Sequence, residues 1–275
     1  NELAVKITHF QSWSELVLPE NETKQLHEII NYFNNKHIVY EKWGYGKKSP
    51  LGKGLNVLFF GQSGTGKTMA AGVIARELEL DLYKIDLSSI VSKYIGETEK
   101  NLNKIFTEAQ SSNAVLFFDE ADALFGARSD VKDAHDRYAN IEVGYLLQKM
   151  DEYTGISILA TNMKDNIDDA FIRRMHAIVE FYYPDEEHRY KIWKKSFTKE
   201  TPMSDDVDLS FMAKQFHLSG GNIRNIILFA GFYAAGNGGM VTMEHLIYST
   251  KREFEKMGRS ATRQEFGEYY ELVKE

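Results

Sequence analysis

The feature that most constrains the fold of this chain is a glycine-rich run that ends in Lys-Thr. The run reads Gly61-Gln62-Ser63-Gly64-Thr65-Gly66-Lys67-Thr68, with the spacing G-x-x-x-x-G-K-T. The apolar segment 55–60 precedes it and predicts a buried parallel strand, whereas 67–80 has the apolar spacing of a helix. A strand, a glycine loop and a helix in this order predict a loop that wraps phosphate groups.

The chemistry expected of this loop follows from its residue types. Glycines let the backbone curl so that its N–H groups point at phosphate oxygens, and the helix N-terminus adds partial positive charge. Lys67 is then expected on the β and γ phosphates of ATP, and the Thr68 hydroxyl on Mg²⁺. The predicted nucleotide contacts in this segment are Gly61, Gln62, Ser63, Gly64, Thr65, Gly66, Lys67, Thr68 and Met69.

Two adjacent carboxylates supply the expected metal and water side of the site. The apolar strand candidate at 114–118 runs into Asp119-Glu120. Ligands of parallel sheets bind beyond the carboxyl ends of the strands, so we expect Asp119 in the Mg²⁺ shell and Glu120 on the attacking water. Alone, these acids would be helix-capping residues about as often. Together with the phosphate loop they favour ATP hydrolysis.

The pattern of elements predicts two domains. Further strand candidates at 82–87, 156–160 and 177–181 alternate with helical segments, which predicts an α/β fold, a P-loop parallel sheet sandwiched by helices. After Pro184 the periodicity is helical throughout. We therefore expect an ATPase core at 1–183 and a small all-helical lid domain at 184–275. Residues 125–136 are polar and are expected to form a loop.

Composition excludes several classes of function. The chain has 275 residues, no cysteine and a net charge of −7, so thiol catalysis and cysteine-ligated metal are excluded and nucleic-acid binding is not favoured. The longest apolar runs are too short to cross a bilayer. No signal peptide is seen at the start, and a reducing cytoplasmic location is expected.

With both motifs placed, the chain resembles the AAA+ ATPases over nearly its whole length. The segment Ile158-Leu159-Ala160-Thr161-Asn162 is similar to the sensor-1 strand of that family, whose terminal Asn helps orient the lytic water. The resemblance carries that role to Asn162. Without the resemblance, an Asn after a strand would be an ordinary turn residue.

A second resemblance concerns the arginines at the end of segment 166–174. This segment is similar to the one that supplies arginine fingers to a neighbouring subunit, which implies a homo-hexameric ring. Arg173 is the first choice for the finger and Arg174 the second. Relatives of the AAA subgroup usually carry another Arg where this chain has His176, so Arg174 could take its place. An exposed basic pair without such a role is the alternative.

The lid domain contains a third resemblance. The segment Gly220-Gly221-Asn222-Ile223-Arg224 is similar to the sensor-2 pattern, which implies that Gly221 approaches the adenine and Arg224 contacts ATP. The AAA subgroup usually has a small residue at that last position. An Arg paired with a surface acid is therefore a serious alternative for Arg224.

The segment 92–99 resembles the first pore loop of AAA+ rings that translocate protein. There Tyr94-Ile95 would grip an extended polypeptide, since an aromatic face can contact many peptide sequences. The resemblance implies a motor that remodels, unfolds or disassembles protein substrates. A nucleic-acid motor or loader, or a nucleotide-controlled binding switch, stays open as the alternative, and Tyr94 could also be an ordinary core residue.

Overall fold

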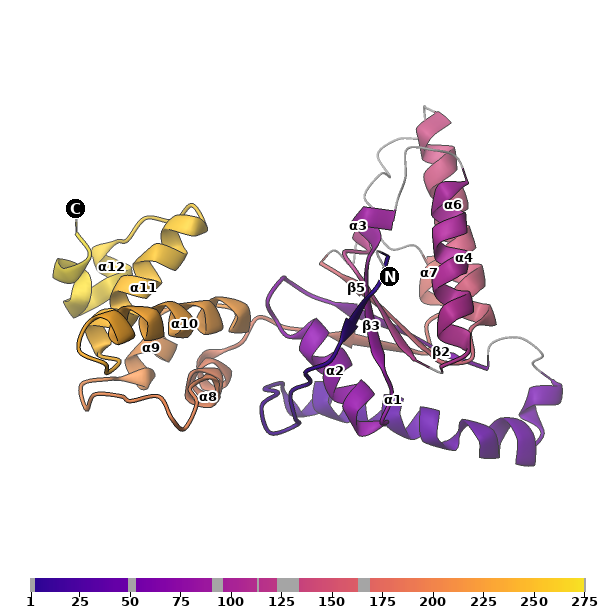
Figure 1. The fold of residues 1–275 in the computed structure, drawn as a ribbon, viewed down its shortest axis with the longest axis horizontal. Helices are drawn as coiled ribbons and strands as arrows, with labels where there is room; N and C mark the ends of the chain where they lie inside the picture. The colour runs from indigo at the N-terminus through magenta and orange to yellow at the C-terminus, as the bar shows by residue number, and fades with distance from the viewer. Residues whose placement is uncertain are drawn as a thin grey trace. The chain divides into compact units, whose positions relative to one another are not determined.

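The computed structural model describes residues 3–48, 53–90, 96–112, 114–122, 134–162 and 169–274, with side chains at 134–140 and 169–170 left aside. Two compact units divide the chain. The first comprises Asn1–Gln62 and Lys67–Tyr182, and the second comprises Ser63–Gly66 and Tyr183–Glu275. Figure 1 shows a sheet with helices in the first unit and a group of helices in the second.

A six-stranded sheet with the order β1-β3-β4-β5-β2-β6 forms the centre of the first unit. Pairing is parallel throughout, except that β1 runs antiparallel to β3. The strands are β1 (Val5–Ile7), β2 (Leu55–Phe60), β3 (Leu82–Asp86), β4 (Val115–Asp119), β5 (Ile156–Thr161) and β6 (Ala177–Glu180). The predicted α/β class with a helix-covered parallel sheet is confirmed, although β1 was not predicted.

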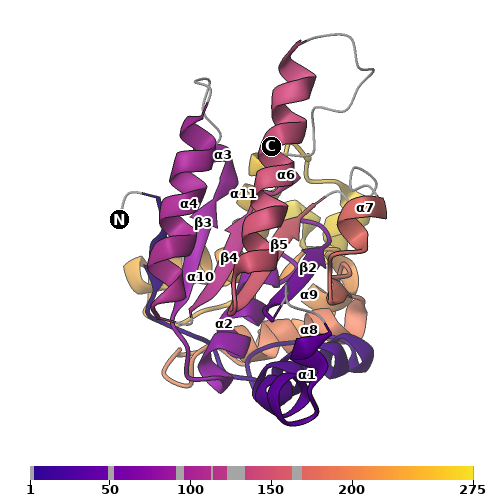
Figure 2. The same ribbon diagram turned by 90° about the vertical axis from the view of Figure 1, so that its right-hand side faces the viewer.

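Both faces of this sheet are buried, which explains why the central strands β2, β4 and β5 are mostly apolar. Leu58 and Phe118 pack on one face with α3, α4 and α6, whereas Val57 and Phe117 pack on the other with α1 and α2. Figure 2 shows α4 and α6 on one side of the strands and α1 and α2 on the other. The helices of this unit are α1 (Glu20–His37), α2 (Lys67–Glu77), α3 (Leu87–Ile90), α4 (Glu97–Gln110), α6 (Ala134–Glu152) and α7 (Asp169–Ile172).

Two helices of this unit differ from what the sequence predicts. Helix α1, which is followed by a π-helical turn at Ile38–Lys42 and a 3-10 turn at Tyr45–Lys47, was not predicted. Residues 134–136, expected in a loop, belong to the backbone of α6. The rest of that expected loop lies outside the described residues.

The second unit has a separate aromatic core. Phe216 contacts Phe254 and Phe266 edge-on, with ring centroids 5.8 and 5.0 Å apart, and Trp193 is fully buried beside them. Its helices are α8 (Glu186–Ser196), α9 (Leu209–Gln215), α10 (Gly220–Gly236), α11 (Met243–Lys256), α12 (Arg263–Phe266) and a 3-10 turn at Gly267–Leu272. Among the described residues of the chain, no helix combines the length and the apolar character needed to cross a membrane.

Candidate active site

The phosphate loop leaves the sheet at the carboxyl end of β2 and enters α2. Gly61, Gly64 and Gly66 have φ angles of 142°, 77° and 109°, values that L side chains rarely adopt. A Cβ on Gly61 would lie 2.1 Å from the Phe181 carbonyl oxygen, so this position also needs glycine for close packing. The glycine spacing therefore reflects the backbone path of the loop, as the sequence predicts.

Lys67 extends into the centre of this loop. Its Nζ donates to the carbonyl oxygens of Gly61 and Gln62 at 2.5 and 3.0 Å, and to Asn162 Oδ1 at 3.0 Å. Burial lowers the Lys67 pKa, while the charges of Asp119 and Asp122 oppose the shift. The hydrogen bonds of this ammonium all go to neutral oxygens, so a phosphate would add a charge-assisted contact to a partly buried cation.

The predicted acids lie at the carboxyl end of β4. Asp119 Oδ2 pairs with Lys84 Nζ at 2.8 Å, and its Oδ1 accepts the Glu120 N–H at 3.0 Å. Glu120 is exposed and has a left-handed backbone with φ of 54°. An L-residue in this region costs free energy, and such residues concentrate at functional sites. The geometry thus presents one fixed carboxylate and one solvent-facing carboxylate side by side.

Asp122 is a site residue that the sequence reasoning missed. Its carboxylate accepts the Asn162 N–H at 3.1 and 3.2 Å and also the Thr161 hydroxyl. Asn162 in turn accepts from Lys67, so Asp122 fixes the backbone of the residue that contacts the loop lysine. A third acid within four residues of a strand end was visible in the sequence, but its partner is 40 positions away.

Comparisons with known proteins agree with this geometry. The profile of the family described as "ATPase family associated with various cellular activities (AAA)" matches residues 57–183. These residues are an AAA ATPase domain. Protein CdcH of Halobacterium salinarum is 36% identical over 205 residues, which cover 72% of this chain and 26% of that protein.

A Plasmodium falciparum protein whose name contains the words "cell division cycle ATPase" is 29% identical over 284 residues. This match covers 93% of the chain but 22% of the relative. The chain therefore spans about a quarter of the length of the two relatives, and the AAA domain is the part whose family is shown.

The predicted arginine fingers follow α7 of the AAA domain. Arg173 and Arg174 are both exposed, and Arg174 Nη1 pairs with Asp151 Oδ2 at 3.2 Å. Asp151 also accepts the side-chain N–H of Asn56, the second residue of β2. Asn56 and Gly61 are five residues apart on an extended strand, or roughly 16 Å. Arg174 is thus held near the start of β2, whereas the phosphate loop follows the end of this strand.

The sensor-2 resemblance lies at the start of α10 in the second unit. Ser219 caps this helix reciprocally with Asn222, and within this unit the Gly221 N–H donates to the Gly64 carbonyl at 3.0 Å. Arg224 is exposed one turn later. The adenine contact of Gly221 and the ATP contact of Arg224 stay predictions.

Two further predictions concern the pore-loop pair and the magnesium site. Tyr94 and Ile95 lie outside the described residues, and the description resumes at Gly96, whose left-handed backbone precedes α4. For magnesium, the described residues hold no cluster of three or more His, Asp or Glu side chains. A site built from Asp119, Thr68 and phosphate oxygens fits this finding, because Mg²⁺ usually keeps several waters and takes few protein ligands.

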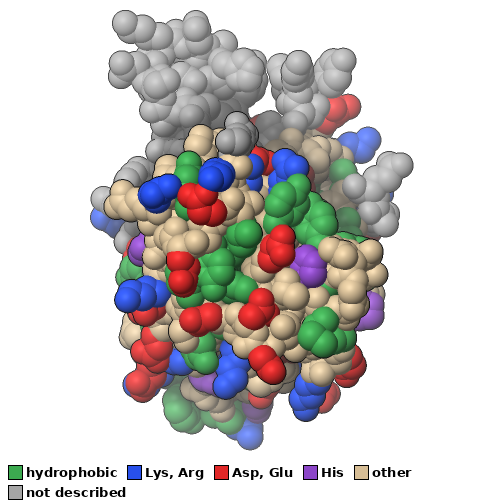
Figure 3. All heavy atoms as spheres, turned by 90° about the vertical axis from the view of Figure 1, so that its left-hand side faces the viewer, with side chains coloured by type: hydrophobic (Ala, Val, Ile, Leu, Met, Phe, Trp, Pro, Cys, Tyr) green, Lys and Arg blue, Asp and Glu red, His purple; other side chains and the backbone are tan. Residues whose placement is uncertain are grey.

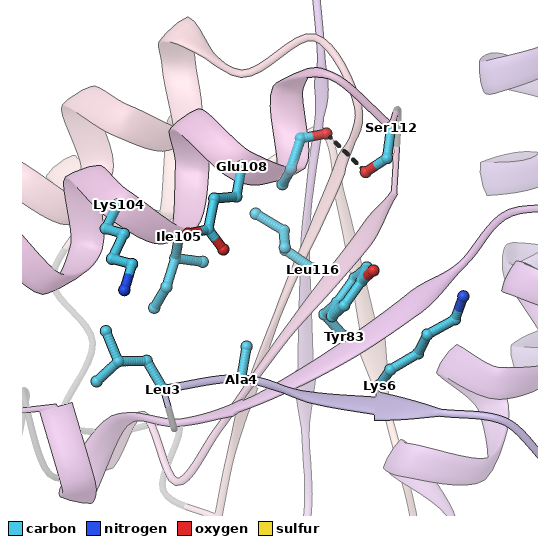
Figure 4. Close-up of a pocket in the computed structure, with 10 residues that line it drawn as sticks. Leu3, Ala4, Lys6, Tyr83, Lys104, Ile105, Glu108, Ser112 and Leu116 are labelled. Carbon is cyan, nitrogen blue, oxygen red and sulfur yellow. Dashed lines mark hydrogen bonds between the residues drawn. The ribbon is translucent and has the colours of Figure 1, made fainter. Parts of the chain in front are cut away.

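A cavity of about 290 Å³ lies elsewhere in the first unit. Figure 4 shows Leu3 and Ala4 facing Ile105 and Leu116 across it, with Lys6 and Lys104 at its rim. None of the predicted ATP-site residues lines it. This cavity is therefore separate from the predicted ATP site.

Proposed function

We propose that this chain is an ATP-hydrolysing motor module that acts in a homo-hexameric ring and remodels protein substrates. The observation that carries the ATPase part is the placement of Lys67. Its ammonium lies within the glycine loop, contacts Asn162 and feels the charges of Asp119 and Asp122. The proximity of Lys67 to Asn162 and Asp119, both expected in the site from the sequence, supports this part of the proposal.

The residues have distinct roles in the proposed reaction. The loop N–H groups and Lys67 hold the β and γ phosphates, while Asn162 orients the water that attacks the γ phosphate. Glu120 accepts a proton from that water as it attacks. Asp119 and Thr68 would hold Mg²⁺, which supplies charge neutralisation on the phosphates when bound.

The ring is supported by the distance between Arg174 and its own loop. An arginine that neutralises charge on the transferred phosphate accelerates hydrolysis strongly. Because Arg174 is fixed near the opposite end of β2, the finger segment is better placed for the site of a neighbouring subunit. Any closed ring of identical subunits would provide that neighbour at every site.

A protein client is supported by charge and by the pore-loop resemblance. The chain has 40 acidic and 33 basic residues. Figure 3 shows acidic side chains spread among basic ones on the face that it presents. Such a surface provides little attraction for a phosphate backbone, whereas Tyr94-Ile95 offers the aromatic and aliphatic surface that would grip a polypeptide.

The ATPase part is tested by Glu120→Gln. This variant should bind ATP with unchanged affinity but lose turnover by on the order of 10²–10⁴-fold, because the amide cannot take the proton. Nucleotide titration and phosphate release are measured side by side. Turnover within a few fold of the parent would exclude Glu120 as the base.

The client part is tested by ATPase stimulation. A permanently unfolded protein should stimulate turnover, and Tyr94→Ala should abolish the stimulation without changing basal turnover. Tyr45→Ala is the matched control, since it removes an exposed tyrosine that is far from that segment in sequence. Stimulation by DNA or RNA alone, unaffected by Tyr94→Ala, would contradict protein remodelling and favour the nucleic-acid motor.

A further inference from the structure

A buried asparagine interrupts the apolar strand that leads into the phosphate loop. Asn56 is 2% exposed, in a strand whose other residues are all apolar and buried. Buried amides are costly unless hydrogen-bonded. Among the described residues its Oδ1 has no partner, so the position retains a polar side chain despite an unsatisfied atom. Its retention calls for a role that an apolar residue could not fill.

That role is visible in the contacts of Asn56 with the segment after α7. Its backbone N–H donates to His176 Nδ1 at 3.1 Å, and its carbonyl accepts the His176 N–H at 2.8 Å. Its Nδ2 donates to Asp151 Oδ1 at 3.1 Å. Only the donor end of the amide can face a carboxylate, so the orientation of the Asn56 side chain is determined. The contacts with His176 come from the backbone of Asn56, whereas the contact that needs the asparagine side chain is the one that fixes Asp151.

Asp151, once fixed in this way, holds Arg174. Its Oδ2 accepts from Arg174 Nη1 at 3.2 Å, while its other oxygen stays on Asn56. An isolated surface ion pair contributes little to stability, partly because two mobile side chains must be ordered. Here one partner is already ordered by a buried group, which lowers that entropic cost.

A second set of contacts supports the segment from α1. The His176 and Tyr32 rings lie 5.6 Å apart, and the Tyr32 and Tyr40 hydroxyls are 2.5 Å apart.

Arg173 differs from these residues. It is exposed and has neither a hydrogen bond nor an ion pair with the part of the chain that the structure describes. Of two adjacent arginines, Arg174 is tied to its own subunit, and Arg173 has no polar partner among the residues that the structure describes.

We propose that Arg174 is a positioning residue, held by Asp151 and Asn56 in its own subunit, and that Arg173 is the arginine that reaches the phosphates of the neighbouring subunit. This inference rests on the proposed ring. The sequence ranks Arg173 before Arg174 for the finger, and the contacts of Arg174 give the second arginine a different role. Asn56 lies on the strand that enters the phosphate loop, so the same strand supports one ATP site and the finger offered to the next.

Lysine substitutions separate the two roles. A lysine can keep a single ion pair with a carboxylate but cannot reproduce the planar fork of a guanidinium. Arg173→Lys should therefore lose on the order of 10³-fold in kcat, at the lower end of the range for a lost arginine finger. Arg174→Lys should lose less than about fivefold. Equal large losses in both variants would overturn the assignment.

A double-mutant cycle tests the link to Asp151. If Arg174 acts through Asp151, then Arg174→Ala and Asp151→Asn should reduce kcat similarly, and the double variant should be no worse than either single variant. Glu152→Gln is the matched control, because it removes the adjacent carboxylate, which pairs instead with Lys149. Multiplicative losses in the double variant would contradict the proposal.

Nucleotide affinity distinguishes positioning from general damage to the fold. The finger segment serves the next subunit, so Asp151→Asn and Arg174→Ala should leave the Kd for ATP unchanged while kcat falls. A parallel rise in Kd would overturn the positioning role. Glu120→Gln tests the proposed ATPase activity separately. If Glu120→Gln abolishes turnover but no arginine variant affects it, the ATPase activity is supported and only the assignment of the two arginines is contradicted.

Discussion

Glu120 and Glu79 share a backbone conformation but differ in their surroundings. Their φ angles are 54° and 55°, in the left-handed region that favours glycine. Glu79 ends α2: its N–H donates to the Arg76 carbonyl, and the Leu80 N–H donates to the Ala75 carbonyl, as in the common glycine-terminated helix end. Glu120 has no such helix-terminating role and follows Asp119 at the end of β4. We infer that its side chain is retained for chemistry at the cost of backbone strain.

Glycine substitution at the two positions separates strain from function. Glu79→Gly and Glu120→Gly should each raise the free energy of unfolding by up to about 1 kcal/mol, because glycine relieves the left-handed strain. Only the Glu120 variant should lose ATP turnover. Urea unfolding and phosphate release measure the two effects separately. A Glu120→Gly protein that hydrolyses ATP normally would refute the catalytic interpretation.

His176 makes the stability of the finger segment dependent on pH. Its Nδ1 accepts the Asn56 N–H, which requires the unprotonated ring, and burial against β2 lowers the His176 pKa. Because the folded pKa lies below that of the unfolded chain, the contribution is complete above about pH 6.5. It declines as the pH falls from there through the folded pKa, since the unfolded state takes up the proton first.

A His176→Gln variant tests this dependence, because glutamine can accept a hydrogen bond without titrating. The difference in the free energy of unfolding between the parent and the variant should shift against the parent between about pH 7.5 and 5. Urea titrations at several pH values measure it. A difference that stays constant over this range would show that His176 does not titrate against Asn56.

At the scale of elements, α10 and α11 are joined by a buried carboxylate. Glu253 on α11 is 2% exposed, and its Oε1 accepts from Asn222 and Asn225 of α10 at 2.8 and 3.2 Å. Asn222 also belongs to the cap that starts α10 beside Gly221. This contact therefore sets the position of the predicted sensor-2 residues within the second unit.

Glu253→Ala should destabilise the second unit by roughly 2–4 kcal/mol, because it leaves two amides without their acceptor. Glu244→Ala is the control, since Glu244 is exposed on the same helix. Thermal or urea unfolding followed by fluorescence would report on this unit once Trp13 and Trp43 are replaced by phenylalanine, because the buried Trp193 is then the remaining tryptophan. A loss no larger than that of the control would mean that the amides find other partners.

The five parallel strands, β2 to β6, all lie where the local sequence predicted strands, and the central ones have the clearest apolar pattern. β2, β4 and β5 are short apolar runs bounded by turn residues or acids, and they occur where the pattern indicates. β1 has three residues and an exposed Val5, so only its pairing with β3 makes it a strand. In α1 the buried Glu22, Leu26, Ile29 and Ile30 have helical spacing, but the asparagines around them are weak helix formers.

The site residues also divide into those that belong to a contiguous motif and those that are joined only by contacts between distant parts of the chain. The phosphate loop and the acids after β4 could be predicted because each is contiguous in sequence. The contacts of Asp122 with Asn162 and of Asp151 with Arg174 join residues 40 and 23 positions apart. Such pairs depend on which strands become neighbours, and a single sequence does not reveal that order.

At the scale of the whole molecule, the proposed hydrolysis of one ATP needs residues of two subunits. Lys67 and Asn162 lie at the carboxyl end of the sheet, whereas Arg174 is held near the start of β2. One subunit would bind ATP at the first place and offer Arg173 from the second. Turnover should then require assembly, and the specific activity should rise with protein concentration.

The proposal that two subunits share each ATP site is tested by mixing two inactive variants. Lys67→Ala subunits cannot hold phosphate but keep the finger, and Arg173→Ala subunits keep the phosphate loop but lack the finger. In equal mixtures about a quarter of the sites would combine an intact loop with an intact neighbouring finger. We predict that ATP turnover reappears on mixing, up to about that fraction of the parent rate. A mixture no more active than the sum of the two separate variants would contradict the shared site.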